Sequence, residues 1–187
     1  MNKTVLTSVL AIISLAAGFG YYQYTQQQQA AVADKTSPAS TTKKSLSMLG
    51  QKRADFSLPD LRNNVHEIKE WDNKVILLNF WATWCPPCRK EIPAFIKLQE
   101  EFGPQGFQVI GIAIDEKEAV EDYADGMGVN YPVLIGNSTA MDISAAYGNR
   151  FGQLPYSLVI DRQGIIRFVG KRELSFDDIA EQIKPLL

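Results

Sequence analysis

Both cysteines of this chain stand in one short stretch, NFWATWCPPCRKEIP, where only two prolines separate Cys85 from Cys88. A disulfide between them would close a very short loop, and short loops contribute least to stability by the chain-entropy argument. The cysteines follow KVILLNFW, an unbroken apolar run typical of a strand buried on both faces. After them, Ile92, Phe95 and further apolar residues recur at helical spacing and predict a helix over residues 87–102. The pair is therefore expected where a buried strand ends and a helix begins.

The predicted helix start has the electrostatics that a reactive cysteine needs. Helix N-termini carry partial positive charge and free N–H groups, so they favour the thiolate, which is the nucleophile in disulfide exchange. With Cys85 as the N-cap and Cys88 in the first turn, the first thiol is expected at an exposed lip, where it attacks. Cys88 would then attack the mixed disulfide and release the partner.

Other uses of such a pair fit this sequence less well. A zinc site needs two more ligands, yet the chain has a single histidine, His66, in a predicted hairpin strand. Copper delivery needs a further soft or imidazole ligand, and no His or Cys follows Cys88. A peroxidatic cysteine usually has a different local setting. No metal is expected, and no cofactor either, because no nucleotide-binding fingerprint such as GxGxxG is present.

The uncharged run TVLTSVLAIISLAAGFGYY fills residues 4–22 and is long enough to cross a bilayer as a helix. Tyrosines at its far end suit an uncleaved anchor, whereas AVA at residues 31–33 resembles the cleavage site of a signal peptide. Either way, residues 1–22 are predicted to be a membrane anchor or signal segment. Lys3, the one charge before the run, weakly favours a cytoplasmic N-terminus. The remainder is then expected on the periplasmic or extracytoplasmic face, tethered to the inner (cytoplasmic) membrane, where conditions are oxidising.

The chain after this run divides by composition. Residues 23–49 are rich in Gln, Ser, Thr and Ala without a periodic apolar face, which predicts a flexible polar linker. The folded domain is expected over residues 50–187, and the chain is 45% hydrophobic, enough for a globular core. A formal net charge of −2, rather than an excess of basic residues, argues against nucleic acid as a partner.

The rest of the domain alternates strands and helices. GFQVIGIAI predicts a second buried strand, and DEKEAVEDYADGMG an acidic surface helix closed by glycine. Ser175, with Asp178 three residues on, predicts the N-cap of a closing helix, with Leu174 stapled onto Ile179. The other predicted elements are a hairpin turning at Asn63-Asn64, a strand over 131–135, a helix over 138–147, and a hairpin of YSLVI and IIRFV. This order predicts an α/β fold with a mixed central sheet.

The motif FWATWCPPCRKEIP resembles the active site of the thioredoxin superfamily, in particular its membrane-anchored TlpA/ResA-like thiol:disulfide oxidoreductases. The similarity covers residues 54–187 and includes Pro93 within the helix and the segment LPYSLVIDRQG, where Pro155 matches the family's cis-proline. It implies a thioredoxin fold with an extra N-terminal β-hairpin. It also implies an insert, residues 127–148, between the second parallel strand and the closing hairpin.

The resemblance assigns roles around the cysteines. It implies that Cys85 is the nucleophile and Cys88 the resolving thiol. Leu154 and Pro155 would face them and offer backbone to an incoming peptide. Because an arbitrary X-Pro bond is cis only about 5% of the time, the cis bond at this position is expected from the resemblance alone.

The resemblance also draws attention to a carboxyl group. Glu91, three residues after Cys88, matches the acid of the anchored branch and is a candidate proton acceptor for the Cys88 thiol. The alternative is a surface charge paired with Lys90 or Lys97, as exposed ion pairs are common. Thioredoxin itself carries a buried Asp in the preceding strand; here the position is Asn79, which cannot take a proton.

The residues beside the cysteines bear on substrate binding and on the direction of electron flow. Trp84 is expected to pack over the site and to offer an apolar docking patch, with Pro86 and Pro87 also part of the substrate-binding surface. Proline has no N–H, so two amides that could stabilise the Cys85 thiolate are missing. A less stabilised thiolate lowers the reduction potential, which predicts a reductant.

These inferences predict an extracytoplasmic thiol:disulfide oxidoreductase that reduces disulfides in exported proteins. The family implies a membrane thiol transporter of the DsbD/CcdA type as electron donor. Members dedicated to cytochrome c maturation often carry Glu after the cis-proline, and Tyr156 at that position weakens such a role. The alternatives are a thiol oxidase or isomerase using the same site, and a non-catalytic chaperone or metal-delivery module, which would keep its function in a Cys85→Ser variant.

Overall fold

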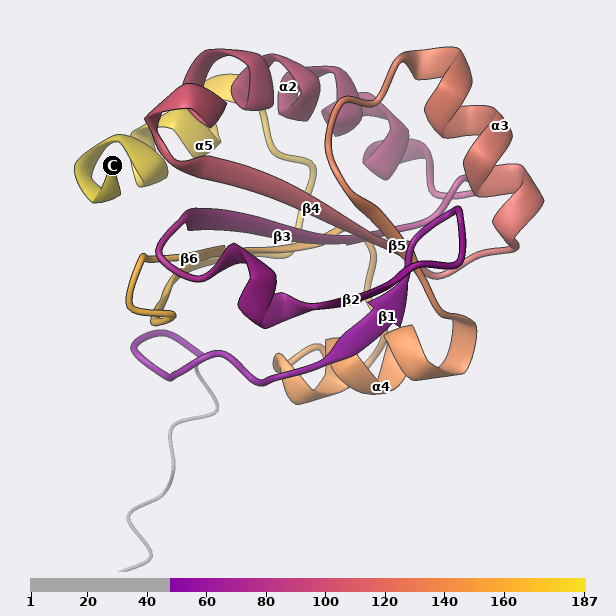
Figure 1. The fold of residues 1–187 in the computed structure, drawn as a ribbon, viewed down its shortest axis with the longest axis horizontal. Coiled ribbons are helices and arrows are strands. Elements are labelled where there is room, and N and C mark those ends of the chain that lie inside the picture. Colours follow the sequence, from indigo (N-terminus) through magenta and orange to yellow (C-terminus); the bar gives the residue numbers. More distant parts are fainter. Residues whose placement is uncertain (1–47) are drawn as a thin grey trace, which may run out of the picture. The chain divides into compact units, whose positions relative to one another are not determined.

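A five-stranded mixed sheet lies at the centre of residues 48–187, the part of the chain that this computed structural model describes (Figure 1). The strands follow the order β5-β4-β3-β6-β7. They are β3 (Val75–Trp81), β4 (Phe107–Ala113), β5 (Val133–Ile135), β6 (Tyr156–Ile160) and β7 (Ile166–Gly170). The α-helices are α2 (Pro86–Phe102), α3 (Lys117–Met127), α4 (Asn137–Ala146) and α5 (Phe176–Ile183). Short 3₁₀ helices span Ile68–Trp71, Gly103–Gln105 and Lys184–Leu186.

The pairing of β3 decides where the functional residues meet. This strand is parallel to β4 and antiparallel to β6, and Phe80 near its end is opposite Tyr156 at the start of β6. The residues that follow β3 and those that precede β6 therefore lie at the same edge of the sheet. Cys85 comes after β3 and Pro155 before β6, so the topology brings both to this edge.

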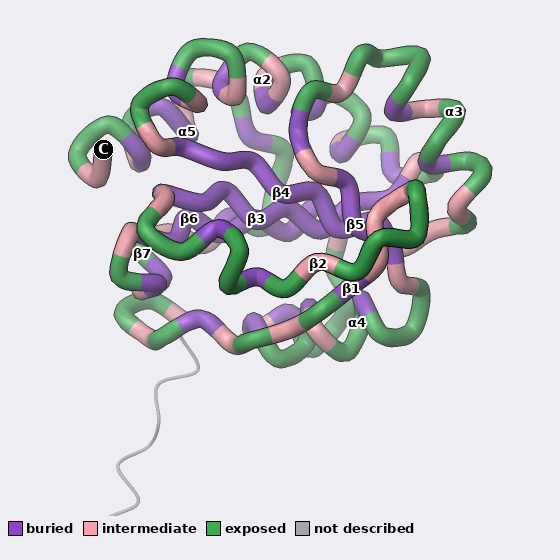
Figure 2. The backbone as a smooth tube through the Cα atoms, viewed as in Figure 1, coloured by how far each residue is buried: buried purple, intermediate pink, exposed green. Residues whose placement is uncertain are grey.

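Helices and the hairpin cover both faces of the sheet. Alternate residues of a strand point to opposite faces. Leu77 and Trp81 pack in the apolar cluster covered by α2, α3 and α5, whereas Leu78 and Phe80 pack in the cluster covered by α4 and the hairpin. Figure 2 shows the resulting burial of the central strands, and every residue of β3 and β4 is buried. The two unbroken apolar runs in the sequence correspond to these strands.

Two local predictions are confirmed. The N-terminal hairpin consists of β1 (Ser57–Pro59) and β2 (Val65–Glu67), which pair antiparallel, and Asn63 in its turn has a φ of 64°. At α5, the Ser175 side chain accepts a hydrogen bond from the Asp178 backbone, and the Asp178 carboxylate accepts one from the Ser175 backbone. This reciprocal capping box satisfies two N–H groups that the helix itself cannot pair.

The predicted α/β fold with a mixed sheet is confirmed. The insert, residues 127–148, contributes a strand and a helix to it. Its strand, β5, pairs parallel with β4 and forms one edge of the central sheet, while α4 packs on the face shared with the hairpin. The predicted anchor or signal, residues 1–22, and the linker up to residue 47 lie outside the described residues. Within residues 48–187, no helix has both the length and the apolar character needed to cross a membrane.

The core under α2 gives a direct stability prediction. Phe95 is fully buried in the cluster beneath the helix, whereas Phe151 is 98% exposed. Truncating a buried Phe to Ala costs about 3–5 kcal/mol, because it removes apolar contact and leaves a cavity. We therefore expect Phe95→Ala to lower the free energy of unfolding by about that amount in denaturant titrations. The control Phe151→Ala should stay within about 0.5 kcal/mol of the parent chain; equal losses in the two variants would contradict this packing.

Candidate active site

Cys85 and Cys88 form a disulfide at the N-terminus of α2. The sulfurs are 2.05 Å apart and the Cα atoms 5.3 Å apart. Cys85 is the N-cap, with φ −94° and ψ 102°, and its Sγ accepts a hydrogen bond of 3.3 Å from the Cys88 N–H. The prediction that Cys85 stands at an exposed lip is wrong for this disulfide form: Cys85 is buried, with 4% of its surface exposed, and Cys88 is fully buried. Cys85 is thus the more exposed residue of the pair, and its Sγ receives an N–H of the kind that stabilises a thiolate.

The segment that leads into the cysteines is held by a residue after β4. Asp115 accepts hydrogen bonds from the backbone N–H and from the hydroxyl of Thr83. The N–H of Cys85 in turn donates to the Ala82 carbonyl at 3.2 Å. Next to this pinned segment, Trp84 is 65% exposed, so its ring stands at the protein surface beside the disulfide. The sequence placed Trp84 here but gave no sign of the Asp115 contact.

The predicted cis-proline is confirmed, since the Leu154–Pro155 peptide bond is cis. The loop before it is tied by Asn149, whose Oδ1 accepts from the Gln153 N–H at 3.0 Å and whose Nδ2 donates to the Gln153 carbonyl at 2.8 Å. Leu154 is half-buried against the core. Tyr156, directly after the cis-proline, is buried and donates its hydroxyl to the Tyr147 carbonyl at 2.8 Å.

Prolines shape α2 itself. Pro86 and Pro87 occupy its first two positions, where a missing N–H costs nothing within the helix. Pro93 lies inside the helix and cannot donate to the carbonyl of Arg89, one turn earlier. The hydroxyl of Tyr123, from α3, donates to that carbonyl at 3.5 Å. The amides missing from the first turn are those on which the predicted direction of electron flow depends.

Glu91 is buried on the inner side of α2, one turn after Cys88, with 1% of its surface exposed. Its Oε1 accepts from Asn79 Nδ2 at 2.8 Å and its Oε2 from the Leu174 N–H at 3.1 Å. Burial disfavours the charged form and raises the pKa of Glu91 to about 8, although these two hydrogen bonds act in the opposite direction. Residues three apart on a helix are neighbours, so this carboxyl lies on the side of α2 that carries Cys88.

The alternative of a surface ion pair for Glu91 is wrong. Lys90 instead pairs with Glu173, at 3.7 Å, and no hydrogen bond or ion pair joins Lys97 to Glu91. The reason is the helical phase: Lys90 and Lys97 fall on the exposed side of α2, whereas Glu91 falls on the buried side with Ile92.

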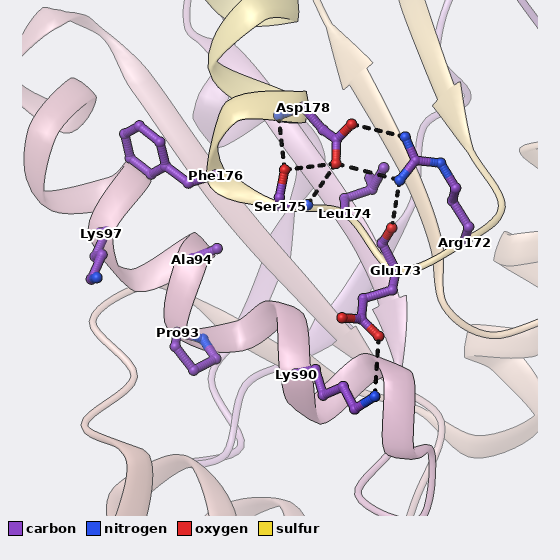
Figure 3. A pocket seen from close by; sticks show the side chains of 10 residues that line it. All are labelled: Lys90, Pro93, Ala94, Lys97, Arg172, Glu173, Leu174, Ser175, Phe176 and Asp178. Atoms are coloured by element: carbon purple, nitrogen blue, oxygen red, sulfur yellow. Dashed lines mark hydrogen bonds and ion pairs between the residues drawn. The ribbon is translucent and has the colours of Figure 1, made fainter.

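A pocket of about 560 Å³ lies on the outer side of this region, between α2 and the segment leading into α5 (Figure 3). Its charged side chains are engaged with one another: Lys90 with Glu173, and Arg172 with Asp178 at 2.8 Å. Leu174 also lines it, and its N–H points the other way, to the Glu91 carboxylate. Leu174 therefore both lines the pocket and, through its backbone N–H, holds the buried Glu91 carboxylate.

Sequence inspection missed the partners of Glu91. It noted that Asn79 cannot take a proton, but not that its amide donates to Glu91 and to Ser157 Oγ, at 2.8 and 2.9 Å. The available signal was a polar residue inside the apolar run VILLNFW, since a buried polar side chain needs a partner. As for metals, residues 48–187 contain no group of three or more His, Cys, Asp or Glu side chains that could hold an ion.

Comparisons with known proteins agree with this geometry. The model of the AhpC/TSA family matches residues 49–169. The thiol-disulfide oxidoreductase ResA of Halalkalibacterium halodurans is 33% identical over 182 residues, covering 95% of this chain and 93% of the relative. The ResA of Geobacillus kaustophilus is 29% identical and covers 98% of both chains.

Solved structures show the same fold. A thiol:disulfide interchange protein of the thioredoxin family from Chlorobium tepidum superposes with a TM-score of 0.67 at 28% identity. The match covers 72% of this chain and 94% of that structure. The predicted resemblance to the thioredoxin superfamily is confirmed: the chain belongs to the AhpC/TSA family of thioredoxin fold, as a thiol-disulfide oxidoreductase.

Proposed function

We propose that this oxidoreductase acts outside the cytoplasm as a reductase of disulfides in exported proteins. The observation that carries the proposal is the dithiol pair of Cys85 and Cys88, joined at the N-terminus of α2 at the sheet edge where the cis-proline segment begins β6. Such a pair can be cycled between dithiol and disulfide without any other group of the protein changing its covalent state.

The reaction starts from the reduced dithiol. The Cys85 thiolate attacks one sulfur of the client disulfide, and the other client sulfur leaves as a thiolate and takes a proton from solvent. Cys88 then transfers its proton to the Glu91 carboxylate, and its thiolate attacks the Cys85 sulfur. The second client sulfur leaves as a thiolate as the Cys85–Cys88 disulfide forms, and it takes a proton from solvent, to which Glu91 in turn releases the proton it received. The client gains two electrons and two protons, and the protein loses two electrons.

Glu91 suits the role of proton acceptor because its pKa lies near neutral pH. A base works best when its pKa is close to the operating pH, since it is then ionised often enough and still basic enough. Burial raises the pKa of Glu91 to about 8. The donors at both carboxylate oxygens keep the ionised form attainable despite that burial.

The direction of electron flow is inferred from the first turn of α2. Pro86 and Pro87 supply no N–H there, and among residues 48–187 the single hydrogen bond to Cys85 Sγ comes from the Cys88 N–H. A Cys85 thiolate with few donors is less stable, so the dithiol gives up its electrons more readily. An oxidase needs the opposite, a strongly stabilised reduced form.

Substrate binding is assigned to the surface beside the disulfide. Trp84 is 65% exposed and offers an apolar face to a client chain. Leu154 and Pro155 are proposed to offer backbone to the client, as the family resemblance implies. We leave the client as disulfide-bearing exported proteins in general, because Tyr156 is engaged with the Tyr147 carbonyl and gives no support for a dedicated role in cytochrome c maturation.

The uncharged run at residues 4–22 supports the location and the partner. We propose that it tethers the domain to the outer side of the inner (cytoplasmic) membrane, by the length argument for a spanning helix. The electrons would then come from a membrane thiol transporter of the DsbD/CcdA type. In that position the protein needs no cofactor of its own, since both of its redox groups are sulfurs.

Two matched reactions test the direction. Reduced protein is mixed with a disulfide-bearing protein such as insulin, and oxidised protein with the reduced form of the same client, and thiols are counted over time. We expect the first reaction to run nearly to completion and the second to stop early, because the dithiol is the stronger reductant. A second reaction that proceeds further than the first would instead make the protein a thiol oxidase.

A further inference from the structure

A row of four small or polar residues crosses the sheet beneath α2. Asn79 on β3 is opposite Gly111 on β4 and Ser157 on β6, and Ser157 is opposite Gly170 on β7. All the other residues of β3 are apolar. A Cβ atom at Gly111 would lie 3.1 Å from Trp81 Nε1, and one at Gly170 would lie 2.8 Å from a Leu174 methyl group. At the two ends of the row, the missing side chains of Gly111 and Gly170 let Trp81 and Leu174 lie directly against the sheet.

Asn79 lies in the middle of this row, and both hydrogens of its amide nitrogen are donated in hydrogen bonds. Nδ2 donates to Glu91 Oε1 at 2.8 Å and to Ser157 Oγ at 2.9 Å. An amide nitrogen carries two hydrogens, so both donors are occupied. The side chain is 1% exposed and that of Ser157 fully buried, so water does not readily replace either bond. Turning the Asn79 amide would place its oxygen against the Glu91 carboxylate and break that hydrogen bond.

We propose that Asn79, held in place by Ser157, is the positioning residue that aims the Glu91 carboxyl toward Cys88. The proposal rests on the proposed function, in which Glu91 accepts the Cys88 proton. It extends that function from the acid itself to the strand beneath it and to β6, the strand that begins at the cis-proline.

Among the described residues, none of the other groups around Glu91 positions its carboxyl through a side-chain hydrogen bond. The Leu174 N–H binds the second oxygen, but it belongs to the backbone and leaves the first oxygen unpaired. Glu173 carries a like charge that raises the pKa of Glu91. Lys90 forms an ion pair with Glu173, at 3.7 Å, and not with Glu91. Burial, and after it the Glu91 charge, raises the pKa of Tyr131, and no hydrogen bond joins its hydroxyl to Glu91. Within residues 48–187, Asn79 is the single side chain hydrogen-bonded to the acid.

If Asn79 has this role, replacing it should change the pH at which Glu91 ionises. The Asn79 donor lowers the pKa of Glu91 against the effect of burial. In Asn79→Asp, a carboxyl of the same shape replaces the donor, and two carboxyls that share a site cannot both ionise easily. In Ser157→Ala, the Asn79 amide keeps its donors but loses the anchor that holds it, so a smaller change in the same direction follows.

The test is a pH titration of Glu91 itself. Full-length oxidised protein, labelled with ¹³C at the glutamate carboxyls, is followed by NMR in a mild detergent. The Glu91 signal is the one that disappears in Glu91→Gln. We expect its midpoint near 8 in the parent chain, raised by about one pH unit or more in Asn79→Asp and by less in Ser157→Ala. Gln108→Glu is the matched control, since it also places a carboxyl at a buried amide of the sheet, but next to Gln99 and Lys74.

An unchanged Glu91 midpoint in folded Asn79→Asp protein, or an equal shift in Gln108→Glu, overturns the proposal. If Asn79→Asp does not fold, Ser157→Ala decides by the same measurement. The rate at which a mixed disulfide is resolved, measured against pH, should shift with the midpoint. Failure of the proposed function looks different: Glu91→Gln would then resolve mixed disulfides at the parental rate at every pH, whatever the NMR midpoints are.

Discussion

Replacing Cys85 with serine is expected to abolish disulfide reduction completely, whereas Cys88→Ser should retain the first step and stall. Cys85 is the residue of the pair with some exposed surface, 4% against none for Cys88, and its Sγ receives the Cys88 N–H, so we expect it to attack. Without it no mixed disulfide forms. Without Cys88 the mixed disulfide forms and persists, because the thiol that resolves it is absent. The measurement is insulin reduction, together with non-reducing electrophoresis to detect a covalent adduct with the client.

The pair of variants controls for folding. Each removes the same disulfide, which joins residues only three apart, so both should show the same small change in denaturant midpoint. A stable adduct should appear with Cys88→Ser and not with Cys85→Ser. Parental insulin reduction by Cys85→Ser would remove the catalytic account and favour a binding module that uses the fold as a docking platform.

The second large effect is expected on stability, from Glu91→Gln. Burial raises the pKa of Glu91 from the ordinary 4.5 to about 8. Between these values we expect the folded protein to keep a proton that the unfolded chain has released, so stability should fall as pH rises. The fall is about 1.4 kcal/mol for each pH unit, or roughly 5 kcal/mol over the whole window, and it is absent below pH 4.5. Glutamine is neutral like the protonated acid, so the variant should lack this loss.

Denaturant unfolding of the oxidised protein at several pH values measures the difference. At pH 5 the parent and Glu91→Gln should be nearly equal, and at pH 8 the variant should be the more stable by several kcal/mol. Glu173→Gln is the control, because Glu173 is an exposed neighbouring carboxylate whose charge contributes least to the raised pKa of Glu91, so most of the pH dependence should remain. If the free energy of unfolding of the parent at pH 8 is not lower than that of Glu91→Gln, Glu91 carries no such desolvation cost.

The parts of the fold that follow local rules could be predicted from the sequence. The buried strands appear as mainly apolar runs, because both faces of a central parallel strand are covered. The start of α5 was readable because Ser175 and Asp178 cap it over three residues. The cysteine pair was readable because its chemistry depends on a strand-to-helix junction that the neighbouring residues define.

The surroundings of Glu91 could not be predicted in this way. Its partners stand at distances in the chain that no local pattern connects: Asn79 lies 12 residues away and Leu174 lies 83 residues away. Ser157, which holds Asn79, is 78 residues from it. Only the pairing of β3 with β6, and the path of the chain from β7 into α5, brings these groups together. Sequence alone therefore left open whether Glu91 was a buried acid or a surface charge.

The reduction potential of the Cys85–Cys88 pair tests the central claim most directly. The full-length protein would be equilibrated in a series of dithiothreitol buffers, with tryptophan fluorescence reporting the state of the disulfide beside Trp84. We predict a potential near that of thioredoxin, about −270 mV, because Pro86 and Pro87 leave the Cys85 thiolate with few donors. A value above about −180 mV, in the range of isomerases and oxidases, would contradict the assignment as a reductase.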